Sequence, residues 1–153
     1  MTDGRIDVAM TETRPARPRT SGPGRTLIVF YFIMTIAALA RSIFEIVAHF
    51  DRAPVSYLLS LVAGLVYLVA TIALVTPGRT AYLVAASAIT FELLGVLVVG
   101  TVTVLDPALF PLVGDRGTVW GYYGLEYLLI PLALPVLGLL FLRSQRRVFA
   151  AAR

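Results

Sequence analysis

The chain has 153 residues, of which 58% are hydrophobic and only 14% are charged, with a mean hydropathy of +0.85; this composition excludes an ordinary water-soluble domain and indicates a protein that uses lipid as part of its solvent. The formal net charge is +4, but the 13 basic residues, all arginine, lie in short segments beside apolar runs, which argues against nucleic-acid binding. The absence of cysteine excludes disulfides, thiolate metal sites and covalent haem attachment within this chain.

Residues 1–25 are polar and rich in Arg, Pro, Thr and Gly, which predicts a disordered cytoplasmic leader. Four apolar runs follow, each as long as the roughly 18 residues that a membrane-crossing helix needs. We predict transmembrane helices at 26–50, 57–75, 81–104 and 120–142, and a basic cytoplasmic tail at 143–153.

The first apolar run has an alternative interpretation. It could be a secretory signal peptide that is cleaved after Ala38-Leu39-Ala40. The run continues past that point to Phe50, which favours an uncleaved helix.

The connections predict an antiparallel, up-and-down order. Residues 51–56 and 76–80 are too few to permit anything except antiparallel neighbours, whereas residues 105–119 are enough for a lid or a re-entrant turn. Five arginines precede the first helix, one lies in the second connection and four lie in the tail, which makes ten against two on the opposite side. We therefore expect an all-α, polytopic four-helix antiparallel transmembrane bundle in the plasma membrane of a bacterial cell, with both termini cytoplasmic.

Aromatic residues lie near the ends of the predicted helices. Amphipathic rings prefer the membrane–water interface. We expect Trp120 and Tyr57 at the outer interface and Tyr82 at the inner one.

Ionisable side chains inside the predicted helices are the candidate functional groups, since each costs on the order of 2.5–3.5 kcal/mol at the bilayer centre. Arg41, Glu45 and His49 recur every four residues and form one polar stripe on the first helix. Glu92 lies near the middle of the third helix and Glu126 near the outer end of the fourth. The second and third helices carry stripes of small and polar residues: Ser60, Gly64, Tyr67 and Thr71, and Ala85, Ala88, Glu92, Gly95 and Thr103.

We expect these groups to point inward and to meet in one polar chamber near the outer surface, because membrane helices pack through small and polar faces. The candidate cluster comprises Arg41, Glu45, His49, Tyr67, Glu92, Tyr123, Glu126 and Tyr127. Carboxyl groups outnumber cations in this set, so either at least one glutamate is protonated at neutral pH or the chamber holds a cation or water. Glu92, the deepest, is expected to be the protonated one, and Arg41 is expected within salt-bridge reach of a glutamate.

Structural interpretations compete with the functional ones. Arg41 and Glu45, one turn apart, are most simply an ion pair that fixes helix packing, and His49 most simply an interfacial histidine. Glu126 with its neighbouring tyrosines could be a packing cluster.

Prolines and a possible metal site are further points of interpretation. Pro131 and Pro135 are expected to kink the fourth helix.

Glu45 and His49 with a glutamate of another helix could bind a divalent metal, but no ligand-spacing motif is complete, so no metal site and no cofactor are predicted.

Five short strings carry a resemblance to known proteins. They are ARS at 40–42, APVSYLLS at 53–60, VYLVAT at 66–71, ELLGVL at 92–97 and PLALPVLGLL at 131–140. Through them, residues 26–145 resemble a functionally unassigned family of small four-helix integral membrane proteins of actinobacteria, which implies the topology and no activity. The chain also resembles, more distantly, the small multidrug resistance exporters, but those carry their essential glutamate in the inner half of the first helix, whereas Glu45 lies in the outer half.

Three functions remain open. The favoured one is a non-enzymatic component or partner-binding subunit of the cell membrane, because no complete catalytic, cofactor or transport motif is present. Its expected partners are membrane lipid and further copies of itself or a larger membrane complex. The alternatives are a proton-linked transporter or channel subunit that uses Glu92 and Glu126, and a lipid- or isoprenoid-modifying enzyme with a carboxyl as general acid.

Overall fold

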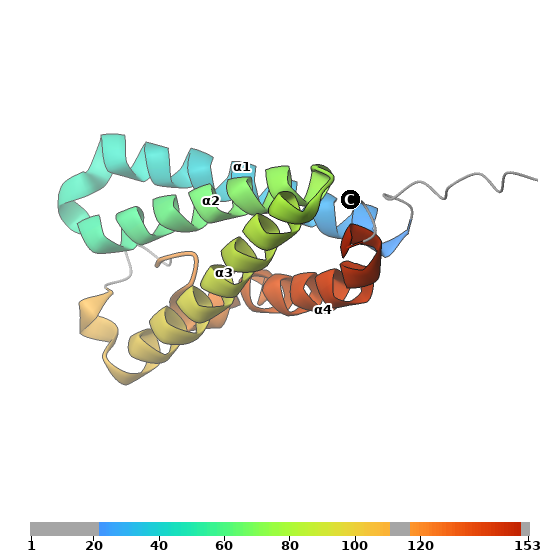
Figure 1. The fold of residues 1–153 in the computed structure, drawn as a ribbon. Coiled ribbons are helices and arrows are strands. Elements are labelled where there is room, and N and C mark those ends of the chain that lie inside the picture. The colour runs from blue at the N-terminus through green and yellow to red at the C-terminus, as the bar shows by residue number, and fades with distance from the viewer. Residues whose placement is uncertain (1–21, 111–116, 151–153) are drawn as a thin grey trace, which may run out of the picture.

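A computed structural model describes residues 22–110 and 117–150 of the chain, with side chains described up to residue 145. All regular structure within these ranges is helical (Figure 1). The predicted leader up to residue 21, residues 111–116 of the third connection and residues 151–153 of the predicted tail lie outside the described residues.

Three long helices account for the first three apolar runs: α1 (Pro23–His49), α2 (Pro54–Val75) and α3 (Arg79–Leu105). Each is long and apolar enough to cross a membrane. Proline occupies the first turn of α1 and of α2, where the missing N–H would have had no helical partner. Residues 23–25, which were assigned to the disordered leader, are therefore helical.

The fourth apolar run is broken, so the prediction of one continuous helix over 120–142 is wrong. A 3-10 segment, η3 (Gly121–Tyr127), precedes α4 (Ile130–Ala150), and the two are bent by 99°. Pro131 lies in the first turn of α4, a position where proline is tolerated. Because proline has no backbone N–H, a helix that precedes it cannot continue through this position. Proline here separates two elements, where only a kink was expected. The described residues thus contain three candidate membrane spans, or four if the bent pair is one span.

The remaining short elements and the end of the chain complete the fold. The 3-10 turns η1 (Phe50–Arg52) and η2 (Pro107–Leu109) follow α1 and α3. α4 continues to Ala150, so the first part of the predicted tail is helical.

Small residues bring the helices together. α1 and α2 lie side by side, and α3 runs obliquely to them and packs against both α2 and α4 (Figure 1). Gly64 of α2 lies so close to α1 that a Cβ there would come within 2.7 Å of the Leu39 side chain. The polar and small stripe predicted on the second helix is buried throughout, as a packing face requires: Ser60, Gly64, Tyr67 and Thr71.

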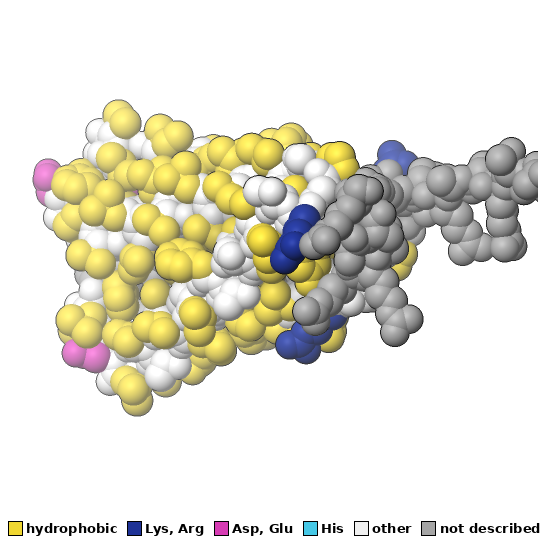
Figure 2. Space-filling model, in the orientation of Figure 1, with side chains coloured by type: hydrophobic (Ala, Val, Ile, Leu, Met, Phe, Trp, Pro, Cys, Tyr) yellow, Lys and Arg dark blue, Asp and Glu magenta, His cyan; other side chains and the backbone are white. Residues whose placement is uncertain are grey.

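The exterior is apolar between two charged ends (Figure 2). At the end where α1 begins, the exposed charged residues include Arg25, Arg79 and Arg143. At the opposite end the described exposed charged residues include Asp51, Arg52 and Asp106. A broad belt of exposed Leu, Ile, Val and Phe between charged ends suits a protein that spans lipid more than once.

The arginine bias predicts which charged end faces the cytoplasm, and the chain offers a clean test because it has no native cysteine. In intact cells, Asp51→Cys and Asp106→Cys should react with a membrane-impermeant maleimide, because both positions are exposed at the end away from the termini. Arg79→Cys should react only after the cells are opened. The reverse labelling pattern would show that the termini lie outside.

Candidate functional site

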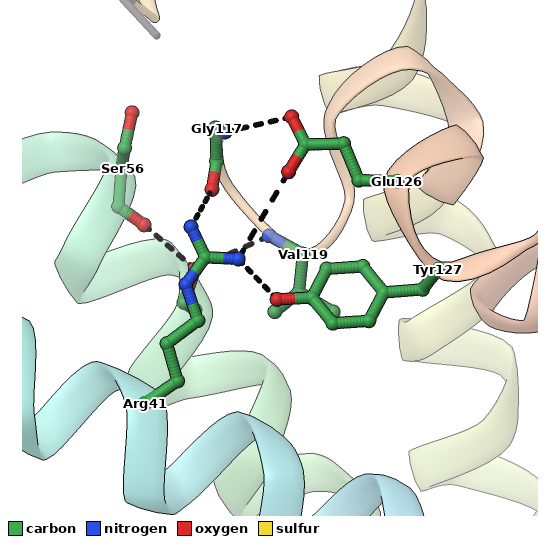
Figure 3. A network of polar contacts seen from close by, with 7 residues as sticks. Arg41, Ser56, Gly117, Val119, Glu126 and Tyr127 are labelled. Atoms are coloured by element: carbon green, nitrogen blue, oxygen red, sulfur yellow. Dashed lines mark hydrogen bonds and ion pairs between the residues drawn. The ribbon is translucent and has the colours of Figure 1, made fainter. Parts of the chain in front are cut away.

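Arg41 of α1 is the centre of a polar network at the broken fourth run (Figure 3). Its Nη1 lies 3.9 Å from a carboxylate oxygen of Glu126 and donates a hydrogen bond to the hydroxyl of Tyr127. Its Nη2 donates to the backbone carbonyl of Gly117 at 2.9 Å. The expectation that Arg41 lies within reach of a glutamate is confirmed, but the partner is Glu126 and not Glu45, which was the simplest candidate.

Glu126 completes this arrangement from the other side. Its Oε1 accepts a hydrogen bond from the backbone N–H of Gly117 at 2.7 Å. Arg41 and Glu126 therefore satisfy both polar groups of one peptide residue and also neutralise each other. We call Arg41, Gly117, Glu126 and Tyr127 the arginine clamp.

The same segment is bound to the other two long helices. The N–H of Val119 donates to Oγ of Ser60 on α2 at 3.2 Å, and Ser60 Oγ donates to the Ser56 carbonyl at 2.9 Å (Figure 3). The N–H of Tyr122 donates to Oγ1 of Thr103 on α3 at 2.8 Å. Irregular backbone at membrane depth persists only where protein groups satisfy it, and here side chains of three helices do so.

The backbone of this segment is strained, which makes those contacts necessary. Four non-glycine residues have φ between 47° and 60°: Tyr122, Tyr123, Leu128 and Leu129. Each such residue costs on the order of 1–3 kcal/mol and is stable only when its surroundings hold it. Gly100 of α3 leaves space for one of them, because a Cβ there would lie 2.6 Å from the ring of Tyr123. The hydroxyl of Tyr123 also lies 3.0 Å from Oγ1 of Thr101.

Glu45 and His49 form a separate pair at the end of α1. Glu45 Oε2 lies 3.5 Å from His49 Nδ1, and the side chains are 21% and 31% exposed. The His49 ring packs edge-on against Phe44. Glu45 also interacts with Tyr57 of α2, but neither Glu45 nor His49 forms an ion pair with Arg41 or a described contact with Glu92 or Glu126, so the stripe of Arg41, Glu45 and His49 does not face one shared chamber.

Glu92 belongs to a third group, inside the bundle. Its side chain is fully buried, and Oε2 accepts a hydrogen bond from the hydroxyl of Tyr31 at 2.8 Å. The Tyr31 ring packs edge-on against Tyr67, with ring centroids 6.1 Å apart. Among the described residues, no arginine or histidine forms an ion pair with Glu92.

Trp120 also packs inside the bundle and is only 2% exposed, although its ring was expected at the outer membrane interface. The reason is Gly95, whose missing side chain leaves room for the indole on α3: a Cβ there would lie 2.7 Å from the ring. Phe91 packs edge-on against the same ring. Tyr57, expected at the outer interface too, is likewise buried, at 4% exposed.

Among the described residues, Glu92 Oε1 has no hydrogen-bond partner, and the buried hydroxyl of Tyr67 interacts with the side chain of Trp120. An ionised carboxylate with a single hydrogen bond and no counter-charge is poorly compensated in such surroundings. A protonated carboxyl group needs no counter-charge and can donate as well as accept. The geometry therefore favours a neutral Glu92.

The eight candidate residues are thus divided among separate groups. Arg41, Glu126 and Tyr127 form the clamp, Glu45 pairs with His49, Tyr67 lies in the interior group around Glu92, and Tyr123 contacts α3. The prediction that all of them meet in one chamber is wrong.

Sequence reasoning missed Tyr31, Gly117 and the buried position of Trp120. A signal for Tyr31 existed, because Tyr31, Thr35, Ala38 and Ser42 recur at helical spacing and all four are buried. No comparable signal existed for Gly117, which acts through its backbone.

Metal-binding groups and similarity to known proteins both bear on what this site can do. Among the described residues, no three His, Cys, Asp or Glu side chains lie close enough to hold a metal ion. No protein-family model, curated protein sequence or solved structure matches this chain.

The arginine clamp predicts a strong coupling between Arg41 and Glu126. Arg41→Gln or Glu126→Gln alone should lower the free energy of unfolding by about 2 kcal/mol, because each strands a partly buried charge. The double variant should cost no more than either single one. Thermal unfolding in one detergent can be followed by the fluorescence of Trp120, the sole tryptophan. Additive losses would mean that the two side chains do not interact.

Glu92 yields the second prediction from the site. Glu92→Gln should unfold like the native protein, because glutamine keeps an oxygen for Tyr31 and removes no charge from a neutral group. Glu92→Ala should cost about 1–3 kcal/mol by leaving that hydroxyl unpaired. The infrared spectrum at neutral pH should also contain a carboxylic-acid C=O band that Glu92→Gln removes. A Gln variant as unstable as the Ala variant would indicate an ionised Glu92.

Proposed function

We propose that this chain is a small, non-enzymatic component of the plasma membrane that acts as a partner-binding subunit, with both termini in the cytoplasm. The observation that carries the proposal is how the intramembrane charges are engaged. Arg41 and Glu126 hold an irregular segment in place, and Glu45 interacts with His49 on its own helix. Charges used in this way support packing and recognition, because they are bonded to the protein itself.

The outer surface offers a place for a partner. An open groove of about 680 Å³ runs between α2 and α3, and its lining is apolar except for Ser87. Ser87 and Ala88 are small, so a helix could approach α3 closely there, and an exposed hydroxyl in lipid gains a hydrogen-bond partner when another helix covers it. We therefore assign this groove to a transmembrane helix of another subunit.

A proton-linked transporter or channel is the second candidate, and one observation favours it. Glu92 is a fully buried carboxyl group with one oxygen that lacks a partner among the described residues, and it interacts electrostatically with the buried hydroxyl of Tyr67. Intramembrane groups of this kind occur in proton relays. Glu126, the other residue of this hypothesis, is bonded to Arg41 and Gly117. Proton-driven flux into proteoliposomes that Glu92→Gln abolishes would favour this candidate.

Two other expectations stay as proposals. The relationship to the small four-helix membrane proteins of actinobacteria depends on five short strings of sequence. A lipid- or isoprenoid-modifying enzyme would need a carboxyl that faces a substrate, and the described contacts of Glu92 and Glu126 are with the protein.

Site-specific photo-crosslinking in native membranes tests the partner-binding proposal. A benzophenone amino acid at Ser87, in the groove, should give one discrete protein adduct. The matched control is Ile36, which is 53% exposed on α1 and does not line this groove. Ser87→Phe, with the crosslinker at Val69 across the groove, should abolish the adduct. Lipid adducts alone at both Ser87 and Ile36 would overturn the proposal.

A further inference from the structure

A second groove lies between the beginning of α1 and the later turns of α4, at the end of the molecule that carries exposed arginines. Its volume is about 560 Å³, within the range of small-molecule sites. Its walls include Leu27 and Phe30 of α1 and Leu137 of α4, and Ser144 and Gln145 add polar groups.

The groove exists because α1 packs mainly against α2 and meets α4 only lightly. One close contact is at Gly24, where a Cβ would lie 2.7 Å from the ring of Phe141. Along α4 the lining runs from Leu134 to Gln145, which is about 16 Å of helix at 1.5 Å per residue. That length matches one leaflet, or about half of the roughly 30 Å hydrocarbon core.

Two exposed arginines stand next to lining residues of this groove in the chain. Arg25 lies between Gly24 and Thr26, which both line the groove, and Arg143 precedes Ser144, which also lines it. Among the residues whose side chains are described, no acidic residue is a chain neighbour of a lining residue. The first turn of α1 has neither an acidic residue nor a side-chain cap, so its dipole contributes further positive potential.

We propose that this groove binds an anionic phospholipid, with one acyl chain along the apolar walls and the phosphate headgroup between Arg25 and Arg143. The length of the apolar groove by itself would suit any lipid chain or a protein helix. The one-leaflet length and the cationic rim together select a molecule with a chain and a negative head. Neither groove has a charged residue in its lining, but exposed arginines are chain neighbours of lining residues only in the α1–α4 groove and not in the described α2–α3 groove. This proposal does not depend on the proposed partner or on the orientation of the termini.

Lipid titration of the full-length protein in detergent, read by native mass spectrometry, tests it. Dioleoyl phosphatidylglycerol should bind at least tenfold more tightly than dioleoyl phosphatidylcholine. Arg25→Gln and Arg143→Gln should each weaken phosphatidylglycerol binding about fivefold. Arg79→Gln is the matched control, because it removes an exposed arginine from the same end of the molecule, and no chain neighbour of Arg79 lines the groove. It should leave the affinity unchanged.

Filling the groove is the second arm. Leu137→Trp should weaken the binding of phosphatidylglycerol, whereas Leu83→Trp in the α2–α3 groove should not, with helix content and unfolding temperature checked for both. Equal binding of the two lipids, or an equal loss with Arg79→Gln, would overturn the proposal. Competition by glycerol phosphate as strong as that by the lipid would also overturn it, because a free phosphate would then suffice.

Discussion

The irregular segment at residues 117–129 cannot satisfy its backbone polar groups as a helix does, and three long helices supply partners for them. A regular helix satisfies its own N–H and C=O groups, but this segment does not have that geometry, and hydrocarbon offers no alternative partners. Arg41, Ser60 and Thr103 supply them from α1, α2 and α3 respectively. An arginine in an apolar helix therefore has a structural explanation: its guanidinium reaches a carbonyl, a hydroxyl and a carboxylate at once.

Glu92 and Glu126 have the same side chain, but their surroundings favour different ionisation states. Glu126 has a cation and a backbone N–H, which suit an ionised carboxylate. Glu92 has one tyrosine hydroxyl and no ion-pair partner among the described residues, which suits a neutral carboxyl. The same side chain thus needs its charge at one position and not at the other, although both residues lie within apolar stretches of the chain.

Sequence alone predicts the elements that depend on length and hydropathy, and the first three helices agree with their predicted ranges to within a few residues. The fourth run is equally long and apolar, yet neither property tells a straight helix from a broken one, and the break depends on Pro131 and on contacts with distant helices. The pairing of Arg41 with a glutamate follows from charge compensation. The prediction of one shared chamber was wrong for a physical reason. Helical periodicity tells which residues share a face of a helix, but it does not tell which neighbouring helix packs against that face, because this depends on the packing of the whole bundle. Gly117 gave no signal, since every residue carries the same backbone groups.

If the interior charges serve the fold, then selectivity for partners has to come from the outer surface, where hydrophobic burial cannot discriminate because lipid is as apolar as the protein. The two grooves differ in the features that lipid does not supply. One has an exposed serine and small residues and no charge, which suits close contact with another helix. The other is one leaflet long and lies beside Arg25 and Arg143, which suits a chain with an anionic head. The two proposed ligands, a protein helix and an anionic lipid, are therefore distinguished by the polar groups at each groove, since both linings are mainly apolar.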